Sequence, residues 1–121
     1  MSKIFIEEQT FEKKDFCESP LEKGEYENCK FLQCNFSDAD ISGLTFSECE
    51  FISCNLSMSN VTKSAFRDVK FKECKMLGIH FDLCNAFQFS VQFENCVLNF
   101  CSFFKMNLKK KNFKHCSSGS R

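Results

Sequence analysis

The sequence predicts an all-β chain that turns a corner every five residues. Large apolar side chains occupy every fifth position from Phe11 to Phe81 without a slip. Neither a helix, with a period of about 3.6 residues, nor a single strand, with a period of about two, keeps residues five apart on one face. A small side chain often stands two positions before the apolar one, and no stretch shows sustained helical spacing.

Phenylalanine fills the five-residue slot more often than any other residue. The chain has 17 Phe among 121 residues. A large apolar side chain that returns at the same point of every unit is expected to face a common core. The phenylalanines that we expect to build this core are Phe31, Phe36, Phe46, Phe51, Phe66, Phe71, Phe81, Phe93, Phe103 and Phe113.

The polar residues of each unit complete a motif. An Asn or Asp often precedes the apolar residue and a Ser or Thr often follows it, most clearly in CNFSDADISG (34–43) and CNLSM (54–58). This pattern, from about residue 9 to residue 116, resembles that of the pentapeptide-repeat family. The resemblance implies a right-handed quadrilateral β-helix, in which four pentapeptides make a coil of about twenty residues and about five coils make the rod.

Residues twenty apart should then lie directly above one another, and the cysteines have this spacing. We expect one core column of Cys34, Cys54, Cys74, Cys96 and Cys116. The small inward slot explains most of the 10 cysteines, because a buried thiol acts as a compact hydrophobic group. We therefore prefer this interpretation to a disulfide framework or to a zinc site formed by Cys29, Cys34, Cys49 and Cys54.

The five-residue period breaks once, between about Leu83 and Phe93. Two extra residues enter there, because the slots from Phe93 onward are out of phase with the earlier ones. The segment is too apolar for a projecting solvent loop, so we expect a bulge or widened corner that adjusts the packing around Phe87 and Phe89. A functional kink is the alternative.

The remaining segments are short. Residues 1–10, with Ile4, Phe5 and Ile6, are expected to form a strand or cap at the open end of the first coil. We expect residues 11–116 to form the β-helix and residues 117–121 to form a flexible tail or an artefact of cloning. No apolar run approaches the roughly 18 residues of a membrane span, and the N-terminus does not resemble a signal peptide, so we expect a cytoplasmic protein without a membrane partner.

The two halves of the chain carry opposite charge. Residues 1–60 contain 12 acids and 5 bases, net −7, and residues 61–121 contain 4 acids and 11 bases, net +7. Such a dipole can steer a charged partner or align copies head to tail, although it is also an ordinary way to fill the surface of a rod. The candidate partner face is Asp38, Asp40, Glu48 and Glu50, and the basic end is Lys105, Lys109, Lys110, Lys111 and Lys114.

No pattern of residues indicates a catalyst. His80 and His115 stand at outward positions, with no nucleophile, paired acid or phosphate loop beside them in the sequence. We expect a non-catalytic protein without a metal or cofactor. Direct binding of nucleic acid by the lysine cluster is also not expected, since neither a stacking aromatic residue nor a groove-reading helix accompanies it.

The order of residues from Cys54 to Ile79 resembles the quinolone-resistance (Qnr-like) branch of the family. The resemblance implies a cytoplasmic, dimeric rod that imitates duplex DNA, binds DNA gyrase or topoisomerase IV and protects them from quinolones. This hypothesis predicts that the acids of the first half lie along one side of the rod. The alternative is a structural scaffold that self-associates through its coil ends, as a homodimer or an end-to-end oligomer, without a topoisomerase role.

Overall fold

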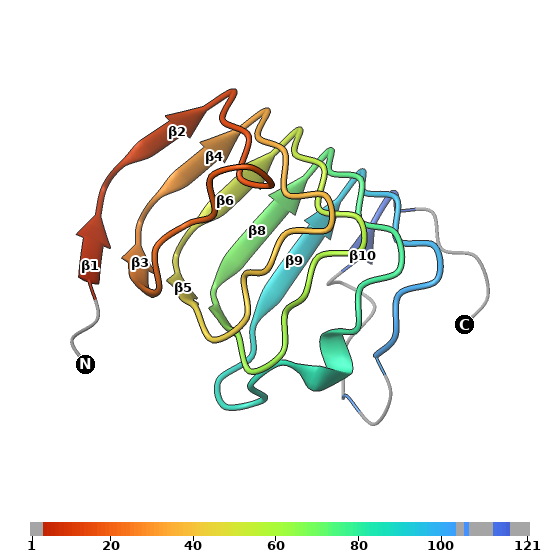
Figure 1. The fold of residues 1–121 in the computed structure, drawn as a ribbon. Helices are drawn as coiled ribbons and strands as arrows, with labels where there is room; N and C mark the ends of the chain where they lie inside the picture. Colours follow the sequence, from red (N-terminus) through yellow and green to blue (C-terminus); the bar gives the residue numbers. More distant parts are fainter. Residues whose placement is uncertain (1–3, 104–105, 107–112, 117–121) are drawn as a thin grey trace.

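A computed structural model describes residues 4–103, 106 and 113–116. These residues form an all-β solenoid of about five coils, which confirms the predicted fold class. Figure 1 shows the strands stacked along a rod, with β1 and β2 at one end and β10 at the other. Within the described residues, no helix is long and apolar enough to cross a membrane.

Two neighbouring sides of the rod carry parallel sheets. One sheet contains β1 (Ile4–Glu7), β3 (Gly24–Glu27), β5 (Thr45–Ser47) and β7 (Ala65–Arg67), in that order. The other contains β2 (Thr10–Glu12), β4 (Lys30–Leu32), β6 (Glu50–Ile52), β8 (Val69–Lys72), β9 (Val91–Glu94) and β10 (Phe113–Lys114). Paired residues lie twenty positions apart along most of the rod, as in Phe31 with Phe51.

The other two sides are joined by isolated bridges instead of strands. On the third side Asn35 bridges both Asp15 and Asn55 in parallel, and on the fourth side Asp40 bridges Asn60. These bridges keep the same twenty-residue spacing, so all four sides of the coil follow the predicted repeat.

Most corners of the coil are made by one residue in the left-handed backbone region. Gln33, Asp38, Gly43 and Glu48 are successive corners, with φ of 53°, 59°, 73° and 53°. The N–H of each donates to a carbonyl of the following coil, for example from Gln33 to Ile52 at 2.9 Å. The five-residue period therefore reflects one left-handed corner per unit, a conformation that costs a non-glycine residue about 1–2 kcal/mol.

Phenylalanine rings stack through the centre of the rod. The column Phe11, Phe31, Phe51, Phe71, Phe93 and Phe113 has successive ring centroids 4.7 to 5.4 Å apart, with near-parallel planes. Rings from neighbouring sides meet it edge to face, as Phe46 does with Phe51 at 5.3 Å. Of the phenylalanines expected in the core, Phe31, Phe36, Phe46, Phe51, Phe66, Phe71, Phe81 and Phe93 are buried, and Phe103 and Phe113 are partly buried.

The small inward slots hold thiols that donate hydrogen bonds to the preceding coil. Cys54 Sγ lies 3.1 Å from the carbonyl oxygen of Phe31, and Cys74 Sγ lies 3.1 Å from that of Phe51. Ser64 makes the equivalent bond to Ile41 at 2.6 Å. In the expected cysteine column, Cys34, Cys54, Cys74 and Cys96 are buried and Cys116 is partly exposed.

The irregularity lies where the sequence places it, but its form differs from the expected packing adjustment. Asn85 still pairs twenty residues back with Ala65, whereas Val91 pairs with Val69, twenty-two residues back. The extra residues therefore enter between these two points, just after a 3-10 turn, η1 (Phe81–Leu83). As a result, the sheet that starts with β1 ends at β7.

Only one of the two phenylalanines of this segment packs inward. The Phe89 ring lies 6.4 Å from the Phe66 ring and 6.3 Å from the Phe81 ring, so it fills the slot that Ala86 would have occupied. Phe87 is 65% exposed. The expectation that the segment accommodates both side chains was wrong for Phe87, which projects on a short solvent-facing turn because the core slot holds a single ring.

The N-terminal segment belongs to the first coil. Ile4 to Glu7 pair in parallel with Gly24 to Glu27, with the twenty-residue offset of the other coils. The strand β1 therefore extends the first sheet of the solenoid by one position. Residues 117–121 lie outside the described part of the chain.

Candidate interaction surface

The four acids of the candidate partner face lie in two pairs on different sides of the rod. Glu48 is a corner residue beside β5, and Glu50 is the first residue of β6. Asp38 is the corner between the third and fourth sides, and Asp40 lies on the fourth side. Ten residues, or half a coil, separate the pairs, so they occupy opposite edges instead of one face.

A larger group of acids lies along the edge where the two sheets meet. We call this group the acidic edge; it consists of Glu7, Glu8, Glu25, Glu27, Glu48, Glu50 and Asp68. Pairing places Glu7 beside Glu27 and Glu25 beside Thr45. Glu8, Glu48 and Asp68 are left-handed corners of the same edge, and Asn28 is the corner between Glu8 and Glu48. All are exposed except Glu50, which is partly exposed.

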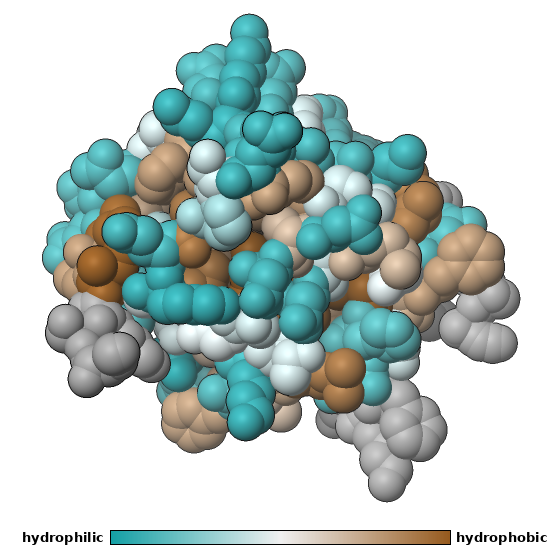
Figure 2. Space-filling model, in the orientation of Figure 1, coloured by the Kyte–Doolittle hydropathy of each residue, from teal (hydrophilic) through white to brown (hydrophobic). Residues whose placement is uncertain are grey.

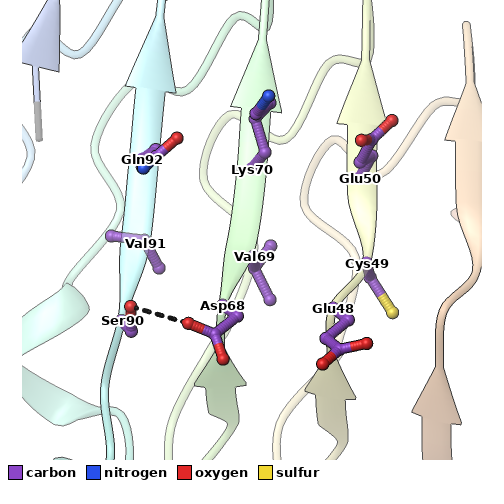
Figure 3. A pocket seen from close by; sticks show the side chains of 9 residues that line it. All are labelled: Glu48, Cys49, Glu50, Asp68, Val69, Lys70, Ser90, Val91 and Gln92. Carbon is purple, nitrogen blue, oxygen red and sulfur yellow. Dashed lines mark hydrogen bonds between the residues drawn. The ribbon is translucent and has the colours of Figure 1, made fainter.

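A shallow groove crosses the acidic edge between β6, β8 and β9. Figure 3 shows its walls as two rows of polar side chains, Glu48, Asp68 and Ser90 on one side and Glu50, Lys70 and Gln92 on the other. Between the rows lie Cys49, Val69 and Val91. The groove has a volume of about 270 Å³, and the Ser90 hydroxyl donates to Asp68 at 3.3 Å.

A second hollow adjoins the first and ends the acidic edge. It has a volume of about 480 Å³ and includes Glu27, Arg67, Asp68 and Phe89 in its lining. The Arg67 guanidinium lies 5.9 Å from the centre of the exposed Phe87 ring. At β7 the acidic surface is therefore followed by the cation Arg67 and by the Phe87 ring, which lies on the irregular turn.

Asp40, one of the two acids on the opposite edge, is held by contacts within the chain. Asp40 accepts hydrogen bonds from the Ser42 hydroxyl at 2.6 Å and the Ser42 N–H at 3.0 Å, and Lys23 Nζ lies 3.9 Å away. The Ser42 hydroxyl, the Ser42 N–H and then Lys23 lower the pKa of Asp40. This carboxylate is thus already satisfied within the chain, unlike the acidic edge, where hydrogen bonds to carboxylates are few.

The residues of the predicted basic end fall mostly outside the described structure. Lys114 is exposed in β10. Lys105, Lys109, Lys110 and Lys111 lie outside the described residues. Within the described part, the cations nearest to the acidic edge are Lys30, Arg67 and Lys70, since Lys30 and Lys70 flank Glu50 in the same row.

The histidines and cysteines do not join this surface as a reactive group. His80 is exposed and its Nδ1 lies 3.9 Å from Asp82, and His115 is an exposed corner residue. Residues 4–103, 106 and 113–116 contain no cluster of three or more side chains of the types that bind metals. Burial raises the pKa of Cys49 to about 12, which keeps the thiol beneath the groove neutral at physiological pH.

Sequence reasoning missed the acidic edge as a unit. It identified Glu48 and Glu50 but not Asp68, which lies in the half with net positive charge. The twenty-residue spacing between Glu48 and Asp68 was the available signal, because the same spacing had already aligned the cysteines.

Comparison with known proteins agrees with the repeat and the coil. A family model described as a pentapeptide repeat region matches residues 19–89. The chain belongs to the pentapeptide-repeat family. A comparison of this pentapeptide-repeat protein with curated protein sequences found no significant match.

Solved structures with similar folds include two proteins. Full-length QnrB1, a plasmid-mediated fluoroquinolone resistance protein, is 17% identical with a TM-score of 0.39, and the match covers 94% of this chain and 71% of QnrB1. A trypsin-treated form of QnrB1 is 19% identical, with a TM-score of 0.39 and coverage of 95% and 71%. The pentapeptide-repeat protein Rfr23 from the cyanobacterium Cyanothece 51142 is 10% identical, with a TM-score of 0.44 and coverage of 94% and 83%.

Proposed function

We propose that this pentapeptide-repeat protein is a non-catalytic binding protein whose acidic edge imitates DNA. The proposed partner is a cytoplasmic type II topoisomerase, DNA gyrase or topoisomerase IV, and the proposed consequence is protection of that enzyme from quinolones. The partner is suggested by the resemblance of residues 54–79 to the quinolone-resistance branch. The structural support is the acidic edge.

The density of negative charge along this edge is more than half that of DNA. The first three turns of the edge carry two carboxylates each: Glu7 and Glu8, Glu25 and Glu27, and Glu48 and Glu50. Lys30 lies beside Glu50 and offsets one of these charges. With coils about 4.8 Å apart, the three turns therefore carry about one net negative charge per 2.9 Å of rod. B-DNA carries about one negative charge per 1.7 Å of axis. A surface that binds the phosphate backbone through Lys and Arg would meet a similar field here.

The acidic edge is short, which limits how much of a DNA site it can replace. Three turns span about 15 Å, the length of about four base pairs of DNA. At β7 and β8 the charge changes, because Arg67 and Lys70 enter the surface. We therefore propose contact with one patch of a DNA-binding surface, centred on the groove beside Glu48 and Asp68.

The test measures both binding and protection. The chain is added to purified gyrase, and supercoiling is assayed with and without a fluoroquinolone while binding is measured in parallel by surface plasmon resonance. We expect saturable binding that linear duplex DNA competes away, together with recovery of supercoiling in the presence of the drug. If the chain bound neither gyrase nor topoisomerase IV, the proposal would be refuted.

Matched charge variants separate the acidic edge from charge in general. The edge variant is Glu27→Gln with Glu48→Gln, and the control is Glu22→Gln with Asp38→Asn, which removes the same charge from exposed positions elsewhere on the rod. Each removed contact to a charged partner group should weaken binding several-fold, so the edge variant is expected to lose about tenfold or more. Equal losses in both variants would contradict a role for the edge itself.

The scaffold hypothesis makes a different prediction. The open strands β1 and β2 end their sheets, and the opposite net charges of the two halves could align copies head to tail. Such stacking would produce oligomers that grow with concentration and dissolve as salt is raised. Sedimentation velocity at increasing salt distinguishes it from the binding role.

A further inference from the structure

The irregular turn holds a phenylalanine ring on the surface beside β7. Phe89 fills the core slot, so the Phe87 ring stays outside and is 65% exposed. The Phe87 N–H donates to Asn85 Oδ1 at 2.9 Å. At the other end of the turn, the Ser90 N–H donates to the carbonyl of Phe66 at 2.9 Å. These hydrogen bonds fix the turn, so the fold sets the position of the exposed ring.

The Phe87 ring carries the guanidinium of Arg67. Arg67 is the last residue of β7, and its Cζ lies 5.9 Å from the centre of the ring. A guanidinium within about 6 Å of an aromatic face is attracted to it. Arg67 Nε is buried and makes no hydrogen bond. The ring thus takes the place of the polar partner that such a donor usually has.

Two carboxylates flank Arg67, and it pairs with neither of them. The Glu48 N–H donates to the Arg67 carbonyl at 2.8 Å, and Asp68 follows Arg67 in the chain. All three residues line the hollow of about 480 Å³. In the described part of the chain, no ion pair within 4.0 Å involves Arg67, Glu48 or Asp68. The contact with the ring therefore leaves both carboxylates without an ion pair.

The ring and the carboxylates compete for the same guanidinium on nearly equal terms. An exposed cation–π contact and an exposed ion pair contribute similar, small free energies. Removal of the ring alone should therefore let the guanidinium turn toward Glu48 or Asp68, which line the same hollow. The carboxylate that it met would then be less available to a cation from outside.

Free carboxylates matter on a surface that is mainly polar. On the face shown in Figure 2, hydrophilic side chains dominate and apolar ones form small separate patches. Charged groups on such a surface attract and orient a partner of opposite charge. Each carboxylate that pairs within the chain weakens this attraction.

We propose that Phe87 is a positioning residue: its ring holds Arg67 and thereby keeps the carboxylates of Glu48 and Asp68 free for cationic groups of the partner. This role rests on the proposed function, because it requires that the acidic edge bind a cationic surface. The two extra residues of the turn then serve more than packing, since they place a ring outside the core. Neither of the tests needs a topoisomerase, so a failure to bind gyrase would refute the proposed function alone.

Nuclear magnetic resonance tests the contact itself. Arg67 and Arg121 are the only arginines of the chain, so a ¹⁵N-labelled sample gives two Nε–H signals, which Arg67→Lys assigns. We expect an upfield ring-current shift of the Arg67 side-chain protons that disappears in Phe87→Ala and persists in Phe87→Trp. Arg67 signals that stay the same in Phe87→Ala would overturn the proposal.

Binding of a cationic probe tests the consequence. The probe is fluorescein-labelled hexalysine, and its binding is measured by fluorescence anisotropy at low salt, where charge contacts are strongest. Phe87→Ala should weaken binding about two- to fivefold, and Phe87→Trp should bind as the unchanged chain does. Phe87→Ala with Arg67→Gln should recover the affinity, because no guanidinium is left to occupy the carboxylates. Circular dichroism verifies that each variant folds.

Two controls separate this mechanism from simpler ones. Phe87→Ala with Lys63→Gln removes the same positive charge from an exposed corner of a different edge and should recover little affinity. Phe100→Ala removes a similarly exposed ring from the opposite edge and should leave binding unchanged.

Four results of the probe assay would each overturn the proposal. The first is that the unchanged chain does not bind hexalysine, and the second is that Phe87→Ala binds it as tightly as the unchanged chain. The third is that Arg67→Gln fails to restore binding to Phe87→Ala, which would mean that the ring contacts the probe directly. The fourth is that Lys63→Gln restores binding equally well, which would mean that only the total charge matters.

Discussion

Replacing Phe51 by alanine should be among the most destabilising single substitutions in this chain. Its ring is fully buried and lies 4.7 Å from Phe31, 5.0 Å from Phe71, 5.3 Å from Phe46 and 5.7 Å from Phe36. A buried Phe→Ala change typically costs about 3–5 kcal/mol, and the loss of ring pairs favours the upper part of that range. Small domains have about 5–15 kcal/mol in total, so about a quarter or more of the stability should disappear.

The same column provides a graded control. Phe11 is only partly buried and contacts the rings of Phe16 and Phe31, so Phe11→Ala should cost about half as much as Phe51→Ala. Phe87→Ala removes an exposed ring and its contact with Arg67, so its cost should stay below about 1 kcal/mol.

Urea denaturation followed by far-UV circular dichroism, at neutral pH with reductant, measures these differences. The three variants should share one slope and differ in midpoint, because the surface exposed on unfolding is nearly the same. The reasoning fails if Phe51→Ala costs less than about 1.5 kcal/mol, or if Phe11→Ala is as costly as Phe51→Ala. Either result would mean that stability does not follow the number of neighbouring rings.

Three further sets of measurements test the corners, the thiols and the buried ionisable groups. Gly43→Ala should destabilise the fold by about 1 kcal/mol, because φ is 73° there, although open space surrounds the site. Gln33→Gly, at φ 53°, should stabilise the fold by a similar amount. Thermal denaturation measures both changes. Cys54→Ser should change the stability by less than about 1 kcal/mol, because a hydroxyl can donate to the Phe31 carbonyl as Ser64 does to Ile41. Cys54→Leu should cost about 1–3 kcal/mol, because the larger side chain overpacks the slot. Equal stability of the two variants in urea would contradict this reasoning. Burial raises the pKa of Cys49 from 9.0 to about 12 and that of Tyr26 from 10.0 to about 12, so their contribution is complete below pH 9 and is lost as pH rises toward 12. Stability measured in urea should thus fall steeply above pH 9, by an amount on the order of 4 kcal/mol for Cys49 alone, and Cys49→Ser should shift the fall to higher pH.

The inside of the rod could be predicted from the sequence because each coil repeats it. Phe31, Phe51 and Phe71 meet the same surroundings in successive coils, so the requirement for a large ring leaves a period that can be counted. The same holds for Cys34, Cys54 and Cys74 in the small slot. Even the position of the irregularity follows, since two extra residues must displace every later slot.

The outside of the rod could be predicted only in part, because its residues are not subject to a common packing constraint. The sums of charge over each half obscured that Asp68 continues the line of Glu48. The acids at 38 and 48 are close in sequence but lie on opposite edges. Phe87 violated the rule that large apolar residues lie inside, which holds for the core slots but not for a turn where Phe89 already fills the available space.

The twenty-residue coil makes the length of this molecule adjustable in whole steps only. Residues twenty apart occupy equivalent points, so removal or duplication of a complete coil would rejoin matching corners and change the rod by about 4.8 Å. An insertion or deletion of any other length must be accommodated locally. The two extra residues between Asn85 and Val91 are accommodated in this way, and the sheet that starts with β1 stops at β7 as a result. Evolution can therefore shorten or extend the reach of such a rod toward its partner in discrete increments, without redesigning the core.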